Sequence, residues 1–275
     1  MLTSTFIHIP GIGSATEQKL WASQILDWED EIHLPRMKLT EAKQNSIKTF
    51  LQESRYHLQK TDPGFFEARL PAKQHFRFFP EFRNTCAYLD IETTGLDSSA
   101  QITTIAIYNG QQIKYFIQGE NLQYFPDELK KYSVLITYNG RSFDIPFIED
   151  YFNITLPHSQ IDLRYVLAGL GFKGGLKRCE KSLGIDRKEL NGVDGYFAVL
   201  LWQEYRRSKN FRALETLLAY NIEDVINLET LMIKAYNLNV EKTVFAGLLN
   251  IKTADRPANL FAPDHKTIQK LKQGY

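Results

Sequence analysis

The chain has 275 residues, of which 43% are hydrophobic and 13% aromatic, so it can bury a substantial core and is not a disordered chain. Its net charge of +1 neither indicates nor excludes a nucleic-acid partner. Two cysteines exclude a disulfide framework, and the scattered histidines form no zinc-site pattern. Because no apolar run approaches a membrane span and no signal-peptide pattern opens the chain, we expect a cytoplasmic protein without a membrane partner.

Residues 1–83 are predicted to form a small, mainly helical N-terminal region. A Pro-Gly-Ile-Gly turn at residues 10–13 precedes a helical pattern at 15–21. This turn and helix resemble part of a helix-hairpin-helix DNA-binding element, in which N–H groups at the helix start hold a phosphate. Residues 1–9 are too short and too β-like for the first helix of that element, and a simple packing turn is the alternative.

Further helical patterns occupy residues 28–32 and 40–57. Residues 61–83 contain three prolines and several phenylalanines, and we interpret them as a connector to the next domain.

Residues 84–240 alternate between strand-like and helix-like segments, which predicts an α/β domain with a mixed sheet flanked by helices. Strands are expected at 85–91, 102–108, 112–118 and 134–138, and helices near 143–152, 163–170, 175–183, 193–208 and 211–236. Asn109-Gly110 predicts a hairpin between the second and third strands. Residues 241–275 are expected to pack as an irregular tail.

Two acids end the first of these strands. Asp90 and Glu92 lie two residues apart, so both carboxylates should point to the same face of the strand. Paired carboxylates on an apolar strand repel each other and are costly to desolvate, and a divalent cation such as Mg²⁺ or Mn²⁺ offsets that cost. The Thr-Thr-Gly turn at residues 93–95 leaves room for a ligand beside them. Two solvated acids at an edge strand are the alternative.

Two later segments supply further acids. Asp144 opens a helix after the turn at Asn139-Gly140, where a single acid is commonly a helix cap. Tyr220 and Asp224 are four residues apart on a long amphipathic helix, so they share one face beside its apolar stripe.

The three segments Asp90-x-Glu92, Asn139-Gly-x-x-Phe-Asp144 and Tyr220-x-x-x-Asp224 resemble, in order, the three motifs of the DEDDy 3′–5′ exonucleases. These are DnaQ-like nucleases of ribonuclease H-like fold. The middle motif is also similar to that of family B DNA polymerases. The Asp162-Leu-Arg stretch and residues 173–177 (Lys-Gly-Gly-Leu-Lys) further resemble the bacterial YprB-like proteins.

The resemblance implies a metal-dependent exonuclease that releases nucleoside 5′-monophosphates from a free 3′ end of single-stranded DNA or RNA, with no nucleotide cofactor. Two divalent cations, Mg²⁺ or Mn²⁺, would be held by the four acids Asp90, Glu92, Asp144 and Asp224. Tyr220 would orient the attacking water, because an unperturbed phenol with a pKa near ~10 is a poor base at neutral pH.

The same resemblance implies substrate contacts at Thr93, Leu96, Asn139 and Phe143, with core packing as the alternative for Phe143. For Asp162 we expect a structural salt bridge first and an outer role at the site second. Between residues 163 and 214 there are eleven basic residues and five acids, which favours a polyanion partner. Lys173, Lys177 and Lys181 are spaced to line one helical face toward phosphates, with a solvated helix face as the alternative.

Two other hypotheses stay open. A nuclease fold that has lost catalysis would serve as a nucleic-acid-binding module, although such a module needs neither the acids nor the tyrosine. Alternatively, residues 1–83 would make the chain a protein-interaction adaptor with an accessory nuclease.

Overall fold

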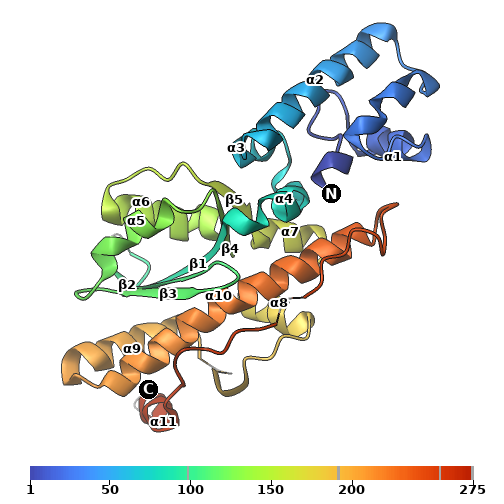
Figure 1. Ribbon diagram of the computed structural model, residues 1–275. Coiled ribbons are helices and arrows are strands. Elements are labelled where there is room, and N and C mark those ends of the chain that lie inside the picture. The colour runs from blue at the N-terminus through green and yellow to red at the C-terminus, as the bar shows by residue number, and fades with distance from the viewer. Residues whose placement is uncertain (98, 191–192, 254, 274–275) are drawn as a thin grey trace.

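A computed structural model describes residues 1–97, 99–190, 193–253 and 255–273 (Figure 1). Within this part of the chain, a five-stranded sheet lies at the centre with helices on both faces, and a group of N-terminal helices stands at one end. This arrangement confirms the predicted mixed sheet flanked by helices, with a mainly helical N-terminal region. No helix of the described residues is both long and apolar enough to cross a membrane.

The sheet combines an antiparallel meander with two parallel strands. In spatial order its strands are β3 (Ile113–Ile117), β2 (Ile102–Tyr108), β1 (Cys86–Thr93), β4 (Val134–Thr137) and β5 (Ser159–Asp162). β1 is antiparallel to β2 and parallel to β4, which is parallel to β5. The carboxyl ends of β1, β4 and β5 therefore lie at the same edge of the sheet.

The hairpin between β2 and β3 turns where the sequence predicts. Gly110 has a φ of +87°, a conformation that favours glycine. The side chain of Asn109 accepts hydrogen bonds from the backbone N–H groups of Gln111 and Gln112, at 3.0 and 2.8 Å. The turn is thus closed by its own side chain, as is usual for asparagine in turns.

Helices cover both faces of the sheet (Figure 1). They are α5 (Phe125–Leu129), α6 (Asp144–Phe152), α7 (Leu163–Gly169), α8 (Leu176–Ser182), α9 (Gly195–Ser208) and α10 (Phe211–Val240). α10 is buried along most of its length and is the long helix beneath the sheet in Figure 1. The predicted helices from α6 to α10 are confirmed to within a few residues at each end.

The two faces of β1 enter different cores. Leu89 and Ile91 pack in a cluster with residues of α5 and α6. Tyr88 packs in another cluster that contains the buried side chains of α10. Because side chains alternate along a strand, Asp90 and Glu92 lie on the same face as Tyr88, toward α10. A local irregularity in the pairing with β2 follows Glu92 and ends the regular ladder there.

The N-terminal region is built from helices, most of them short. They are η1 (Leu2–Ser4), α1 (Ser14–Ala22), η2 (Trp28–Arg36), α2 (Glu41–Gln59), α3 (Pro63–Glu67), η3 (Ala72–Phe78), α4 (Phe79–Phe82) and η4 (Arg83–Thr85), where η denotes a 3-10 helix. Arg77 on η3 makes two hydrogen bonds to the buried carboxylate of Glu17 on α1, at 3.0 and 2.9 Å. Glu17 also accepts the backbone N–H of Phe6, at 2.7 Å. This buried network ties α1 to the segment that leads into the sheet.

Three sequence predictions are wrong in part. Residues 61–83 form α3, η3 and α4, and their phenylalanines join the buried cluster that contains α10, so they are core rather than connector. The expected irregular tail contains a helix, α11 (His265–Gln273), although residues 254 and 274–275 of that tail lie outside the described residues. Strand β5 was not expected, because Ser-Gln-Ile-Asp has one apolar residue and lacks the alternating pattern of a strand.

The helix-hairpin-helix resemblance remains partial. α1 does begin just after the turn at residues 10–13, but residues 1–9 contain the short 3-10 helix η1 rather than a first helix. Lys43 on α2 donates to the carbonyl of Pro10, at 3.2 Å. The division into residues 1–83, 84–240 and 241–275 stays a prediction.

Candidate active site

Two carboxylates project from the C-terminal half of β1. Glu92 is buried and Asp90 is partly exposed, and both lie on the face toward α10. Glu92 faces Thr104 of β2 across the ladder. The strand period of two residues thus places both acids on one surface, as predicted from their spacing.

Asp224 meets this pair from α10. Oxygen atoms of Asp90, Glu92 and Asp224 lie within 4.8 Å of one another, a separation at which one cation can be shared. Tyr220 lies one turn earlier on the same face of α10 and is also buried. Residues more than 120 positions apart in the chain therefore converge because α10 packs along β1 and β2.

The fourth acid, Asp144, approaches β1 from the first residue of α6. Its Oδ1 accepts the backbone N–H of Ile91 at 3.2 Å, which places the carboxylate between Asp90 and Glu92 along the strand. Burial raises the pKa of Asp144 to about 7, although the N–H of Ile91 opposes that rise. Asp144 is thus more than a helix cap, because its charge faces the other acids.

Asn221 holds Asp90 in position, a contact that sequence reasoning did not identify. Its Nδ2 donates to Oδ2 and to the carbonyl oxygen of Asp90, at 2.7 and 3.2 Å. Its Oδ1 accepts the hydroxyl of Thr104 on β2, at 3.1 Å. Because Asn221 follows Tyr220 directly, the third motif carries this bracing residue within it.

The four acids make an electrostatically costly cluster. Burial is the main cause that raises the pKa of Asp90 and of Glu92 well above the ordinary values, and the charge of Asp224 adds to it. Burial also raises the pKa of Asp224 to about 6. Hard oxygen ligands at this spacing fit a divalent cation such as Mg²⁺ or Mn²⁺, whose charge would offset this repulsion.

A buried arginine contacts the acid cluster. Arg187 forms an ion pair with Oδ1 of Asp224, and its Nε and Nη2 donate to the carboxylate of Glu180 on α8, at 2.6 and 2.7 Å. Glu180 also accepts Nδ2 of Asn227 from α10, at 2.9 Å. Burial alone would lower the pKa of Arg187, but Asp224 and Glu180 raise it above its ordinary value. Sequence reasoning counted Arg187 only as one basic residue of many.

Tyr220 is a neutral phenol in this setting. Burial, together with the charges of Asp224 and Glu92, raises the pKa of its hydroxyl well above the ordinary value. The Nζ of Lys177 on α8 lies 4.6 Å from the centre of the Tyr220 ring. Lys177 and Lys181 lie four residues apart on α8, whereas Lys173 precedes this helix. The prediction that all three lysines share one helical face is therefore wrong for Lys173.

The predicted substrate contacts surround the cluster. Thr93 is buried and donates its hydroxyl to the carbonyl of Gly95 at 2.6 Å, whereas Leu96 is 86% exposed in the turn beyond it. Phe143 is half-buried, with its ring 5.7 Å from that of Phe147.

Asn139 adopts the left-handed conformation, with a φ of +67°. Asp162 braces this turn, because its carboxylate accepts the backbone N–H groups of Asn139 and Arg164, at 2.8 and 3.0 Å. The expectation of a structural salt bridge at Asp162 is therefore replaced by a helix cap that also supports the turn before Asp144.

The raised pKa values predict a stability that depends on pH without metal. Buried carboxyls with folded pKa values of about 7 for Asp144 and about 6 for Asp224 favour the protonated form. Their stabilising contribution is complete below the unfolded pKa near ~4 and is lost as pH rises through 6 to 7, at about 1.4 kcal/mol per pKa unit. In chelator, the melting temperature of Asp144→Asn minus that of the wild type should therefore be larger at pH 8 than at pH 4, as measured by scanning calorimetry. An equal difference at both pH values would contradict this.

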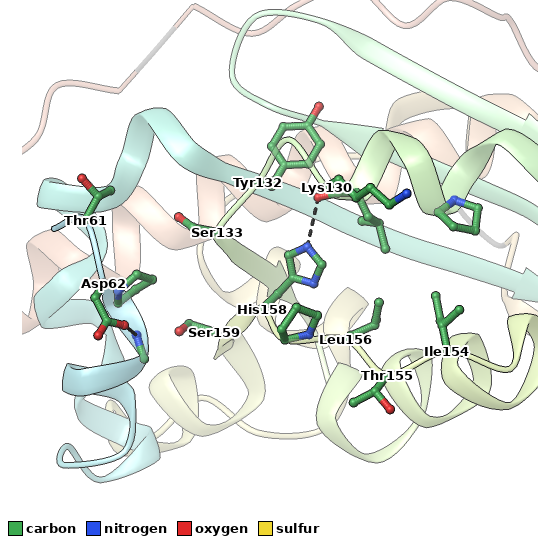
Figure 2. Close-up of a pocket in the computed structure, with 15 residues that line it drawn as sticks. Thr61, Asp62, Lys130, Tyr132, Ser133, Ile154, Thr155, Leu156, His158 and Ser159 are labelled. Atoms are coloured by element: carbon green, nitrogen blue, oxygen red, sulfur yellow. Dashed lines mark hydrogen bonds between the residues drawn. The ribbon is translucent and has the colours of Figure 1, made fainter.

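A separate pocket lies at the opposite end of the sheet. It has a volume of about 650 Å³ and is lined by residues of the α3 start, the α5–β4 connection and the loop before β5 (Figure 2). In this pocket Nε2 of His158 donates a hydrogen bond to the carbonyl oxygen of Leu129, at 3.0 Å. The pocket adjoins the amino ends of β4 and β5, whereas ligands of such sheets usually bind at the carboxyl ends, where the acids lie.

Comparison with known proteins agrees with this fold. A family model described as the RNase_H superfamily matches residues 87–236. A search of curated proteins found no match. Among solved structures, the family B DNA polymerase from the hyperthermophilic archaeon Pyrobaculum calidifontis is similar, with 14% identity and a TM-score of 0.37 over 56% of this chain and 29% of that chain. The chain thus spans less than a third of that polymerase.

The family model covers more than half of the chain. The matched residues include the four acids and the whole sheet except Cys86, the first residue of β1. The predicted ribonuclease H-like fold is therefore confirmed, and the chain belongs to the RNase_H superfamily.

Proposed function

We propose that this chain is a metal-dependent 3′–5′ exonuclease of the DEDDy type, which releases nucleoside 5′-monophosphates from a free 3′ end of single-stranded DNA or RNA. The observation that carries the proposal is the convergence of Asp90, Glu92 and Asp224, whose oxygen atoms lie within 4.8 Å of one another. The charge of Asp144 acts on this group, and the buried Tyr220 lies beside it. Such a cluster destabilises the fold, so a role in packing does not account for it.

In this proposal Asp90, Glu92, Asp144 and Asp224 would hold two divalent cations, Mg²⁺ or Mn²⁺. When bound, the cations supply the Lewis acidity for hydrolysis of a phosphodiester. The remaining residues prepare the site: Asn221 fixes the rotamer of Asp90 through its hydrogen bond of 2.7 Å. A fixed rotamer keeps the carboxylate preorganised, so that no reorganisation is needed at each turnover.

Tyr220 has an orienting role in this proposal. A phenol whose pKa is raised by burial does not remove a proton at neutral pH, but it can donate or accept one hydrogen bond to hold the attacking water. Around the site, Thr93, Leu96, Asn139 and Phe143 are proposed to contact the terminal nucleotides. The exposure of Leu96 supports this, because its apolar side chain, in the turn that follows the two acids of β1, is open to a ligand.

The test is release of mononucleotides from 3′-labelled and 5′-labelled oligonucleotides of DNA and RNA, single and double stranded, with Mg²⁺ or Mn²⁺. The expected result is loss of the 3′ label as a mononucleotide, with stepwise shortening of the 5′-labelled strand. Tyr220→Phe is expected to lower kcat by about 10–100-fold without a matching change in KM, because it removes an orienting hydroxyl. Internal cleavage, or no cleavage with either metal, would contradict the proposal.

One observation favours a second candidate, a nucleic-acid-binding module without catalysis. The ion pair between Arg187 and Asp224 places a protein cation on one of the four acids. If that pair persists, a metal ion has no free access to Asp224. Isothermal titration with Mn²⁺ separates the two candidates, since an exonuclease takes up metal at the acid cluster and a silent binding module does not.

A further inference from the structure

A groove of about 770 Å³ opens at the carboxyl end of β4, between α7 and the loop that precedes α8. Its side-chain lining consists chiefly of Tyr138, Asn139, Arg164, Tyr165, Phe172 and Lys173. It is distinct in position from the four acids, and none of its lining residues has entered the proposed chemistry except Asn139.

The lining of this groove is cationic and aromatic. Arg164 and Lys173 are both exposed, and no acidic side chain is among the described residues that line it. Tyr165 is 39% exposed, and Phe172 is partly buried at the groove wall. Positive charges beside open aromatic faces suit a strand of nucleic acid, in which phosphates pair with the cations and unpaired bases stack on the rings.

Two connections join the groove to the acid cluster. Asn139 lines the groove and lies in the tight turn that ends at Asp144, where the backbone N–H of Ser142 donates to the carbonyl of Asn139 at 3.1 Å. On the other side, Gly175 lines the groove, and Lys177 two residues later lies over the ring of Tyr220. The groove and the acid cluster are thus linked through residues 139–144 on one side and residues 175–177 on the other.

The groove wall is held by specific contacts. The guanidinium of Arg164 donates to Oδ1 of Asn139, and the backbone of Arg164 is capped by Asp162. Gly174 and Gly175 have φ values of +102° and +89°, so the loop takes a course that other residues rarely adopt. These contacts fix the wall that carries the cations before any ligand arrives.

We propose that this groove binds the single-stranded polynucleotide on the 5′ side of the bond to be cleaved. Arg164 and Lys173 pair with its phosphates, and Tyr165 stacks on a base. The inference rests on the proposed function for the placement of the 3′ end. It specifies a single strand because a base paired in a duplex has no free face for Tyr165.

The first test is the salt dependence of binding, measured by fluorescence anisotropy with a 5′-labelled oligo-dT on the full chain carrying Asp90→Asn, which should suppress degradation of the strand during the measurement. Arg164→Gln/Lys173→Gln should reduce the slope of log K against log salt by about 1.4, the value for two lost contacts to a single strand. The matched control is Lys266→Gln/Lys272→Gln on α11, which removes two exposed charges and should leave the slope unchanged. An unchanged slope in the groove variant would overturn the proposal.

Tyr165→Ala supplies an independent test. It should weaken binding of the oligonucleotide by roughly tenfold without changing the salt slope, because stacking involves no counterion release. Undiminished affinity would overturn the role of Tyr165.

Hydrolysis of a one-nucleotide ester, thymidine 5′-p-nitrophenyl phosphate, is measured in parallel on the wild type. Binding with the expected slopes but no hydrolysis of ester or strand would reject the proposed function and keep the groove. Hydrolysis with unaltered slopes would reject the groove alone.

Discussion

Replacing Asp90 with asparagine is expected to lower the rate of mononucleotide release by on the order of 10³-fold or more, while raising the stability of the metal-free protein. Asp90 lies at the centre of the acid cluster, where its oxygen meets those of Glu92 and Asp224 within 4.8 Å. Loss of one ligand from such a set removes a negative charge that the bound cations require. Because the ligands act as a unit, losing one of them removes most of the catalytic effect of the whole set.

The gain in stability has a separate cause. Burial and the charges of Asp224, Glu92 and Asp144 all raise the pKa of Asp90, so its ionised form costs free energy at neutral pH. Asparagine removes that charge and keeps the shape, and its Oδ1 can accept the hydrogen bond from Asn221. Each kcal/mol gained raises the melting temperature by about 2–4 °C in a chain of this size.

Both effects are measurable on one pair of variants. Asp150→Asn is the matched control, because Asp150 is exposed on α6 and does not belong to the acid cluster. It should leave both the rate and the melting temperature in chelator near those of the wild type. An Asp90→Asn protein that is less stable without metal and still degrades 3′ ends would show that the cluster has been misread.

The acids were predictable because their spacing is local. Two residues along a strand and four along a helix each place side chains on one face, so Asp90 with Glu92 and Tyr220 with Asp224 follow from the sequence alone. The two pairs meet because α10 packs against β1. Spacing along the chain does not predict this packing, and only the resemblance to the exonuclease motifs indicated it.

Other features depend on contacts that no local pattern encodes. Arg187 reaches Asp224 from a loop that precedes it by 37 positions, and nothing in its neighbours distinguishes it from the other basic residues. β5 forms because the edge of β4 supplies hydrogen-bond partners to a polar segment. The three prolines among residues 61–83 made this segment resemble a linker. Its phenylalanines are nevertheless buried, because they pack with the N-terminal helices and α10.

Replacing Arg187 with methionine is expected to raise the affinity of the acid cluster for Mn²⁺ by on the order of tenfold or more. The guanidinium now pairs with Asp224, so a cation entering the cluster meets both its charge and a carboxylate that is already engaged. A unit charge at about 4 Å repels a second one by several kcal/mol near a protein surface, and each 1.4 kcal/mol is a factor of ten in affinity.

The same substitution should destabilise the metal-free protein. It leaves the carboxylates of Glu180 and Asp224 buried without their shared partner, and breaking a buried pair in this way costs about 3–5 kcal/mol. Calorimetric titration with Mn²⁺ and thermal unfolding in chelator measure the two effects. Arg178→Met on α8 is the matched control, because Arg178 is exposed and forms no ion pair among the described residues that contact the acids.

A second substitution separates the charge of Arg187 from its packing. In Arg187→Met/Glu180→Gln both partners of the α8 contact lose their charge, so most of the lost stability should return while the raised affinity for Mn²⁺ is kept. If Arg187 instead helps to hold metal in place, both variants would bind Mn²⁺ more weakly than the wild type. If the ion pair between Arg187 and Asp224 breaks without a cost in free energy when Mn²⁺ binds, the affinity for Mn²⁺ would not change in either variant. Only a rise in affinity in both variants agrees with an arginine that competes with the metal for Asp224.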